Sequence, residues 1–129
     1  MGAERVTGIG GAFFRARDPD ALAQWYAVHL GINPMSSESE EVWWQEAGPT
    51  VWAPFPADTD YFGRRDQSWM INFRVADLDA ILAQLREAGV QVDDDIQVME
   101  GIGRFGWASD PEGNRFELWQ PAPNALRHA

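Results

Sequence analysis

An internal repeat constrains the fold of this chain more than any other feature of its sequence. Residues 14–22 align without a gap on residues 73–81, at a constant offset of 59 positions. Self-similarity of this kind indicates a duplicated structural unit. Two such units fill the chain, so we expect a single domain over residues 1–129 that is made of two repeats, at approximately residues 7–54 and 68–121.

Each repeat predicts a helix that begins after an aspartate. Asp18 and Asp77 occupy equivalent positions before an apolar stripe, where a carboxylate side chain caps the free backbone N–H groups of a helix. Pro19 strengthens the first start signal, because proline fits the first helical turn. Apolar residues then recur at helical spacing until a glycine stops each run. The sequence therefore predicts helices at residues 19–30 and 78–88.

The segments that follow each helix predict strands. They are rich in β-branched and aromatic residues and lie between turn signals. The residues 110–114, Asp-Pro-Glu-Gly-Asn, favour a tight turn between the last two strands. Residues 54–67 show no periodicity and are expected to form a connecting loop. The predicted strands lie at residues 41–46 and 50–54 in the first repeat, and at 90–94, 105–109 and 115–120 in the second.

Composition excludes several classes of function. The chain contains no cysteine, which rules out disulfides, thiolate nucleophiles and cysteine metal sites. Twenty acidic residues against ten basic ones give a net charge of −10 at pH 7, and a field of that sign repels a nucleic-acid backbone. No apolar run approaches the roughly 20 residues of a membrane span. The N-terminus lacks the features of a signal peptide, so we expect a cytoplasmic protein. The net charge and the lack of a membrane span lead us to expect no nucleic-acid or membrane partner.

The order and spacing of these motifs resemble a known group of proteins, the vicinal oxygen chelate superfamily, which includes glyoxalase I, bleomycin resistance proteins and extradiol dioxygenases. The resemblance implies an α+β fold in which two βαβββ repeats form incompletely closed mixed sheets. It also implies a substrate on the concave faces of the sheets, often beside a divalent metal, and a homodimer. The motifs that carry it are residues 18–26 leading to 30–31, residues 73–79 and residues 110–118.

The metal ligands of that superfamily are the part of the pattern that this chain does not keep. They come from the first and last strands of each repeat, at positions that fall here on Gly11, Thr50, Met70 and Glu117. Only Glu117 is a residue type that the superfamily uses as a ligand. One carboxylate cannot hold a metal that needs three or four converging donors. We therefore expect no metal and no other cofactor.

Strand alternation predicts what lines the cavity instead. Successive side chains of a strand point to opposite faces of a sheet. If Met70 and Glu117 face the cavity, the residues of opposite parity pack under the helices, and these five are all apolar: Ile71, Phe73, Val75, Phe116 and Leu118. The same reasoning directs residues of the first repeat inward. The predicted ligand-binding residues of one shared cavity are Phe13, Trp52, Met70, Asn72, Glu117 and Trp119.

Aromatic walls with a few polar groups are typical of small-molecule pockets. The expected function is thus the binding of a small aromatic or cationic molecule without a catalytic metal. Two alternatives stay open, a metal-dependent enzyme of glyoxalase, lyase or dioxygenase type and a homodimeric scaffold whose aromatic residues form an interface. Glu117 likewise has two interpretations: it receives a cation or a proton from the ligand, or it pairs with an arginine, the candidates being Arg15, Arg74 and Arg115. No catalytic residue is predicted.

Overall fold

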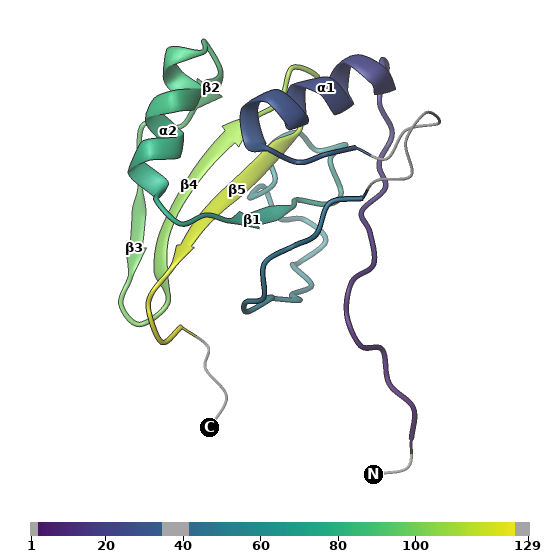
Figure 1. Cartoon of the computed structure of the whole chain (residues 1–129), viewed down its shortest axis with the longest axis vertical. Helices are drawn as coiled ribbons and strands as arrows, with labels where there is room; N and C mark the ends of the chain where they lie inside the picture. The colour runs from purple at the N-terminus through teal and green to yellow at the C-terminus, as the bar shows by residue number, and fades with distance from the viewer. Residues whose placement is uncertain (1–2, 35–41, 126–129) are drawn as a thin grey trace.

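The computed structural model describes residues 3–34 and 42–125. Within these ranges the chain forms two helices and one sheet of five strands (Figure 1). Neither helix is long and apolar enough to cross a membrane. In chain order the elements are α1 (Pro19–Leu30), β1 (Asn72–Arg74), α2 (Leu78–Glu87), β2 (Gln91–Val92), β3 (Gln97–Met99), β4 (Gly103–Ser109) and β5 (Arg115–Pro121).

Both helices begin as the repeat predicts. The side chain of Asp18 accepts a hydrogen bond of 3.2 Å from the backbone N–H of Ala21. Asp77 accepts the equivalent bond of 3.0 Å from Ala80. Helix α1 ends at Gly31, whose φ of 71° lies in the left-handed region that glycine adopts at low cost. The prediction for α1 is confirmed, and α2 ends one residue before its expected end.

The sheet confirms the predicted α+β class and the open, mixed arrangement of strands. Its order is β1-β5-β4-β2, with β3 also paired to β4. Strand β1 runs parallel to β5, while β4 is antiparallel to β2, β3 and β5. Because β5 covers one edge of β4, both β2 and β3 lie along the other edge as one interrupted strand. The second repeat therefore has the expected order of strand, helix and three strands.

The apolar core lies between the helices and one face of the sheet. Helix α2 contributes three leucines to it, at the helical spacing seen in the sequence. The ring of Phe73 meets that of Phe116 edge to face, at 5.6 Å between centroids. Of the residues predicted to pack under the helices, Phe73, Val75, Phe116 and Leu118 belong to this core. Its fully buried members are Leu78, Leu82, Leu85, Ala108, Phe116 and Leu118.

The predicted turn between β4 and β5 forms around a buried aspartate. The carboxylate of Asp110 accepts hydrogen bonds from the backbone N–H groups of Glu112, at 2.9 Å, and Asn114, at 3.0 Å. The hydroxyl of Tyr26 on α1 donates to the same carboxylate at 2.7 Å. Burial and this carboxylate raise the pKa of Tyr26 far above its ordinary value, so the phenol stays a donor at neutral pH. The turn thereby fixes α1 to the second repeat.

A second contact holds the start of α1 to the same turn. The Glu112 carboxylate accepts hydrogen bonds from the backbone N–H groups of Arg17, at 2.7 Å, and Asp18, at 3.0 Å. These bonds hold the pKa of Glu112 below its ordinary value. An acidic side chain of the second repeat thus satisfies free N–H groups at the start of the first-repeat helix.

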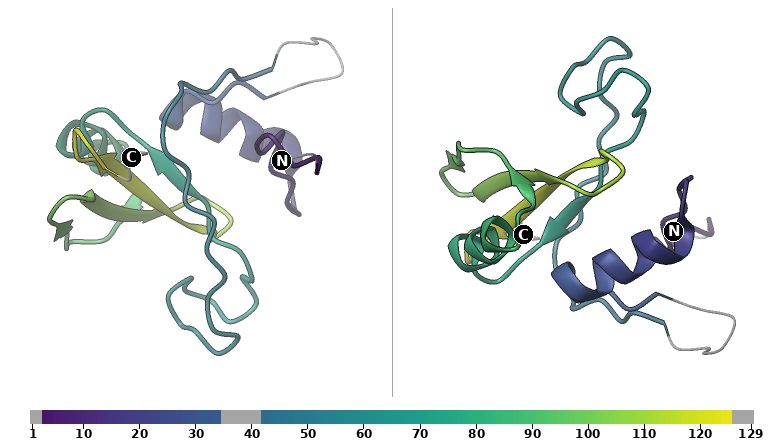
Figure 2. Two further views of the ribbon diagram at one scale, coloured as in Figure 1. Left: turned by 90° about the horizontal axis from the view of Figure 1, so that it is seen from below. Right: turned by 90° about the horizontal axis from the view of Figure 1, so that it is seen from above.

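The strands expected in the first repeat do not form among the described residues. Residues 42–46 and 50–54 carry no β-ladder, and residue 41 lies outside the described ranges. Instead, the guanidinium of Arg74 donates to the carbonyl oxygens of Glu46, at 2.7 Å, and Pro49, at 2.5 Å. The chain before α1 runs away from the sheet (Figure 1, Figure 2). A strand requires ladder hydrogen bonds to a neighbouring strand, and the described residues of these segments make none.

Candidate functional site

The candidate site is the face of the sheet that points away from α2. We call it the aromatic face. Cross-strand register brings its side chains together: Phe105 pairs with Trp119, Trp107 pairs with Glu117, and Glu117 also pairs with Asn72. The rings of Phe105 and Trp119 stack at 5.9 Å with 2° between their planes. The aromatic face consists of Asn72, Phe105, Trp107, Glu117 and Trp119.

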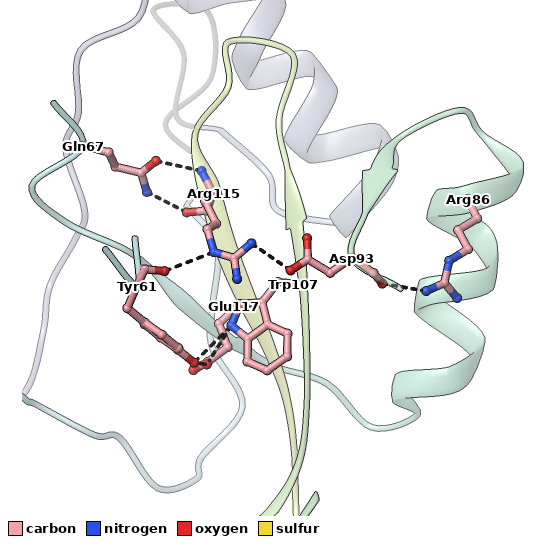
Figure 3. A network of polar contacts seen from close by, with 7 residues as sticks. All are labelled: Tyr61, Gln67, Arg86, Asp93, Trp107, Arg115 and Glu117. Carbon is pink, nitrogen blue, oxygen red and sulfur yellow. Dashed lines mark hydrogen bonds and ion pairs between the residues drawn. The ribbon is translucent and has the colours of Figure 1, made fainter. Parts of the chain in front are cut away.

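Glu117 is the polar centre of the aromatic face. Its side chain is 8% exposed, and its carboxylate accepts hydrogen bonds from three uncharged donors. One is the hydroxyl of Tyr61; the others are Nε1 of Trp107, at 3.0 Å, and Nδ2 of Asn72, at 2.5 Å. Figure 3 shows the phenol and the indole meeting at this carboxylate. A buried carboxylate needs such partners because desolvation otherwise opposes its charge.

Pairing with an arginine, one of the two interpretations of Glu117, does not occur among the described residues. Of the three candidates, Arg115 forms its ion pair with Asp93, at 3.0 Å (Figure 3). Arg74 uses its guanidinium on backbone carbonyls of residues 46 and 49. Across the described ranges Glu117 takes part in no ion pair, with Arg15 or any other residue. Neutral side chains donate to the carboxylate in place of an arginine, because β4 brings Trp107 and the connecting loop brings Tyr61 next to it.

The connecting loop, residues 54–67, is held to the sheet through Arg115. The side chain of Gln67 accepts from the backbone N–H of Arg115, at 2.9 Å, and donates to its carbonyl, at 2.8 Å. This pairing imitates the contacts of a neighbouring strand at the edge of β5. Nε of Arg115 also donates to the carbonyl of Tyr61 at 3.1 Å. The backbone on both sides of the loop is thus fixed near the aromatic face.

The Tyr61 side chain covers part of the aromatic face. Its ring stacks on Phe55 at 5.4 Å and meets the Trp107 ring edge on, at 6.2 Å and 90°. Burial and the neighbouring carboxylate of Glu117 raise the pKa of Tyr61 to about 12. The phenol is therefore protonated at neutral pH and acts as a hydrogen-bond donor.

Three predicted ligand-binding residues come together on β1 and β5. Asn72 and Glu117 are hydrogen-bonded to each other, as described above. Trp119 lies two residues further along β5 and is buried, with Nε1 donating to the carbonyl of Ile102 at 3.0 Å. Met70 is half-buried and precedes β1 by two residues, in the parity that the prediction required.

The predicted residues of the first repeat lie elsewhere in this structure. Phe13 is 98% exposed, and Trp52 is 72% exposed with its ring 6.2 Å from that of Trp69. Neither belongs to the aromatic face, so the single shared cavity stays a prediction. The reason is the one that leaves the first-repeat strands unformed, since residues 11–15 and 50–54 have no neighbouring strand to orient them.

Three residues of the site were missed from the sequence. Phe105 and Trp107 share one parity on a predicted strand, so alternation along residues 105–109 contained the signal that could have identified both. Tyr61 lies in a loop without periodicity. Its contact with Glu117 spans 56 positions of sequence, and no local pattern reports a contact of that kind.

A separate depression of about 370 Å³ lies beside the start of α1, away from the aromatic face. Its two carboxylates are already engaged, Asp66 with Arg64 and Glu112 with the backbone of α1. A polar lining of this kind does not suit an aromatic ligand. The residues around it are Arg15, Ala16, Arg17, Arg64, Asp66, Glu112 and Asn114.

The chemistry of the site does not fit a resident metal. Both oxygens of Glu117 already accept hydrogen bonds, from Tyr61 and Trp107 on one side and Asn72 on the other. Among the described residues, no group of three or more histidine, cysteine, aspartate or glutamate side chains is placed to hold a metal ion. A metal at Glu117 would have to displace neutral donors and find its other ligands elsewhere.

Relatives of the chain extend over most of its length. It is 40% identical over 113 residues to CFP32 of Mycobacterium bovis and of Mycobacterium tuberculosis, which is named as a candidate glyoxylase. The match covers 81% of this chain but only 41% of those proteins, so the chain spans about two fifths of the curated relatives it matches.

Solved structures with similar folds include a protein from Sphaerobacter thermophilus that is described as a member of the glyoxalase/bleomycin resistance protein/dioxygenase superfamily. Its TM-score is 0.58 at 22% identity, with 89% of this chain and 98% of that chain covered. TnmS3, an antibiotic binding protein from Streptomyces sp. CB03234, gives a TM-score of 0.50 at 28% identity and covers 81% of this chain and 88% of its own. The family model of the glyoxalase-like domain matches residues 11–119, which include most of both repeats. The chain therefore belongs to the glyoxalase-like domain family, and it shares its fold with a member of the glyoxalase/bleomycin resistance protein/dioxygenase superfamily.

Proposed function

We propose that the chain binds a small, partly aromatic molecule at the aromatic face, without a resident metal. The observation that supports this most strongly is the gathering of three aromatic rings around a single carboxylate and a single amide on one face of the sheet. Apolar and aromatic walls with few polar groups favour planar organic ligands. The antibiotic binding by TnmS3 that its name records is consistent with this proposal.

The aromatic face supplies two kinds of contact to such a ligand. Phe105, which is only partly buried and stacks on the buried ring of Trp119, offers an aromatic wall. Glu117 and Asn72 offer hydrogen bonds that orient a polar substituent. We further propose that Phe13 and Trp52 complete the site, because their exposed rings need a covering surface.

We propose that a second copy of the chain provides the surface that covers Phe13 and Trp52. Large apolar side chains are exposed on the segments before α1 and after residue 42, including Val6 at 90% and Trp44 at 87%. These segments also carry backbone groups without ladder partners. Residues 11–15 are the repeat equivalents of 70–74, which lead into β1 and its parallel pairing with β5. Packing against a second copy would let the first repeat form the same pairing.

Calorimetric titration of the purified chain with a panel of small neutral and cationic aromatic compounds tests the ligand proposal. Saturable binding is expected, and Trp52→Ala and Trp119→Ala should each weaken it by about 1–3 kcal/mol, the scale of a lost aromatic contact. Val28→Ala, at an exposed apolar residue of α1 outside both the site and the segments that would pack on a second copy, is the control and should leave the affinity unchanged. Unchanged affinity in both site variants, with circular dichroism like the parent, would place the site elsewhere.

The same preparation tests the absence of a metal. Purified without chelators, the protein should contain far less than one equivalent of zinc, iron, nickel or manganese by elemental analysis. A stoichiometric metal that is lost in Glu117→Ala would contradict the proposal.

The homodimer is tested by light scattering at micromolar concentration. The expected mass is twice the 14.5 kDa of one chain. A mass equal to one chain across that range would refute the second copy as the partner, and Phe13 and Trp52 would then have to reach the aromatic face within one molecule.

A further inference from the structure

Tyr61 shows how a phenol fits the aromatic face. Its hydroxyl is bonded to Glu117, and its ring has aromatic neighbours on several sides. Phe55 stacks on it at 5.4 Å, Trp107 meets it edge on at 6.2 Å, and Phe62 lies edge on at 6.4 Å. These contacts suit a hydroxylated aromatic ring, and the Tyr61 side chain occupies them.

Resting on the function proposed above, we infer that the ligand carries an aromatic hydroxyl, which takes the place of Tyr61 on Glu117. Tyr61 is then a side chain that gives way to the ligand and sets its chemical class. Ligand binding exchanges one phenol for another, so the number of hydrogen bonds to the carboxylate is conserved.

The demand for a hydroxyl comes from the burial of Glu117. Its carboxylate is 8% exposed and depends on donors from the protein. A ligand that displaced Tyr61 without bringing a donor would leave this carboxylate short of one hydrogen bond in a largely dry site. Such a ligand is selected against, in the way that a site built for a hydroxyl rejects the analogue that lacks it.

The hydrogen bonds that Glu117 makes at present come from uncharged donors. Every present partner of Glu117 is neutral. The guanidinium of Arg115 lies 5.6 Å from the centre of the Trp107 ring, and it is paired with Asp93 at 3.0 Å and not with Glu117. A ligand hydroxyl would reproduce the neutral bond that Tyr61 makes now.

The exchange needs only a side-chain rotation. The Tyr61 carbonyl is bonded to Arg115, and Gln67 fixes the far end of the loop. The first of these contacts uses a backbone atom of Tyr61, and those of Gln67 do not involve Tyr61. The Tyr61 side chain is half-buried, and the residue lies outside the helices and strands. The loop can therefore stay attached to β5 while the phenol turns out of the site.

A matched pair of naphthalenes tests the inference by calorimetry on the full chain. 2-Naphthol should bind the unaltered protein about tenfold more tightly than 2-methoxynaphthalene, which has a similar ring system but no donor. Tyr61→Phe removes the competing hydroxyl and should tighten 2-naphthol by about fivefold or more while leaving 2-methoxynaphthalene nearly unchanged. Glu117→Gln should reduce the preference for 2-naphthol.

Tyr26→Phe is the matched control. It removes the hydroxyl of the other tyrosine, which is bonded to Asp110 on the helix side of the sheet. The affinities of both naphthalenes should stay as in the unaltered protein. A structural role for Tyr61 alone would make Tyr61→Phe less stable without tightening any ligand.

The outcomes separate this inference from the function on which it rests. Equal affinities of the unaltered protein for the two compounds would overturn the hydroxyl requirement and leave small-molecule binding in place; this comparison needs no variant. Weaker binding of 2-naphthol to Tyr61→Phe would show that the tyrosine helps to hold the ligand and is not replaced by it. No binding of either compound to any variant would overturn both proposals.

Discussion

Gly103→Ala is expected to lower the free energy of unfolding by about 3–5 kcal/mol. Gly103 begins β4 with a φ of +141°, which side chains rarely tolerate. A Cβ atom there would lie 2.2 Å from the backbone oxygen of Gln120 and 2.7 Å from Nε1 of Trp119. The neighbouring strand would have to move, and with it the tryptophan wall of the aromatic face. Chemical denaturation followed by circular dichroism measures the loss.

Gly101→Ala is the control for this prediction. Gly101 lies in the same turn with a φ of +80°, but a Cβ atom there would meet no atom within 4 Å. Only the backbone strain remains, so the expected loss is about 1 kcal/mol. Similar losses in the two variants would mean that the close approach of β5 at Gly103 does not contribute, contrary to the prediction.

Glu117→Ala should lower the free energy of unfolding by about 2–4 kcal/mol. The change removes the acceptor shared by Tyr61, Trp107 and Asn72. Trp107 is 6% exposed, and its indole N–H would keep only the Tyr61 hydroxyl, at 3.1 Å, as its acceptor. The Tyr61 hydroxyl and the Asn72 amide would lose the acceptor that they now share. The connecting loop would also lose its side-chain bond to the sheet. Urea titrations of the variant and the parent measure the difference.

Glu100→Ala is the matched control, because that carboxylate is exposed at the end of β3. Its removal should change the stability by less than about 0.5 kcal/mol. The loss of stability in Glu117→Gln should lie between those of Glu117→Ala and Glu100→Ala. The glutamine amide keeps one acceptor oxygen but replaces the other with an NH₂ donor. A Glu117→Ala variant as stable as the parent would show that the neutral network does not hold the loop.

Glu117 stands at a position where the resemblance to the superfamily implies a metal ligand. The other three positions of that kind hold Gly11, Thr50 and Met70. The carboxylate now accepts hydrogen bonds from side chains of β1, β4 and the connecting loop.

The sequence by itself determined the features that depend on local physics. The caps at Asp18 and Asp77 specify where the helices begin, because the bond that each makes closes within three residues. Alternation along β5 separates Phe116 and Leu118 from Glu117 and Trp119, because it follows from the pleat of a single strand. The repeat and its motifs were enough to identify the superfamily.

Only the tertiary structure decided which partners those side chains found. Tyr61 contacts Glu117 from a loop 56 positions away in the sequence. Arg115 forms its ion pair with Asp93, although Glu117 is only two residues away along β5. Neither contact can be read from the neighbouring sequence, since each depends on how the connecting loop and the segment after β2 pack on the sheet. The first repeat shows the same limit, because the strand propensity of residues 50–54 forms a ladder only where another strand supplies the hydrogen bonds.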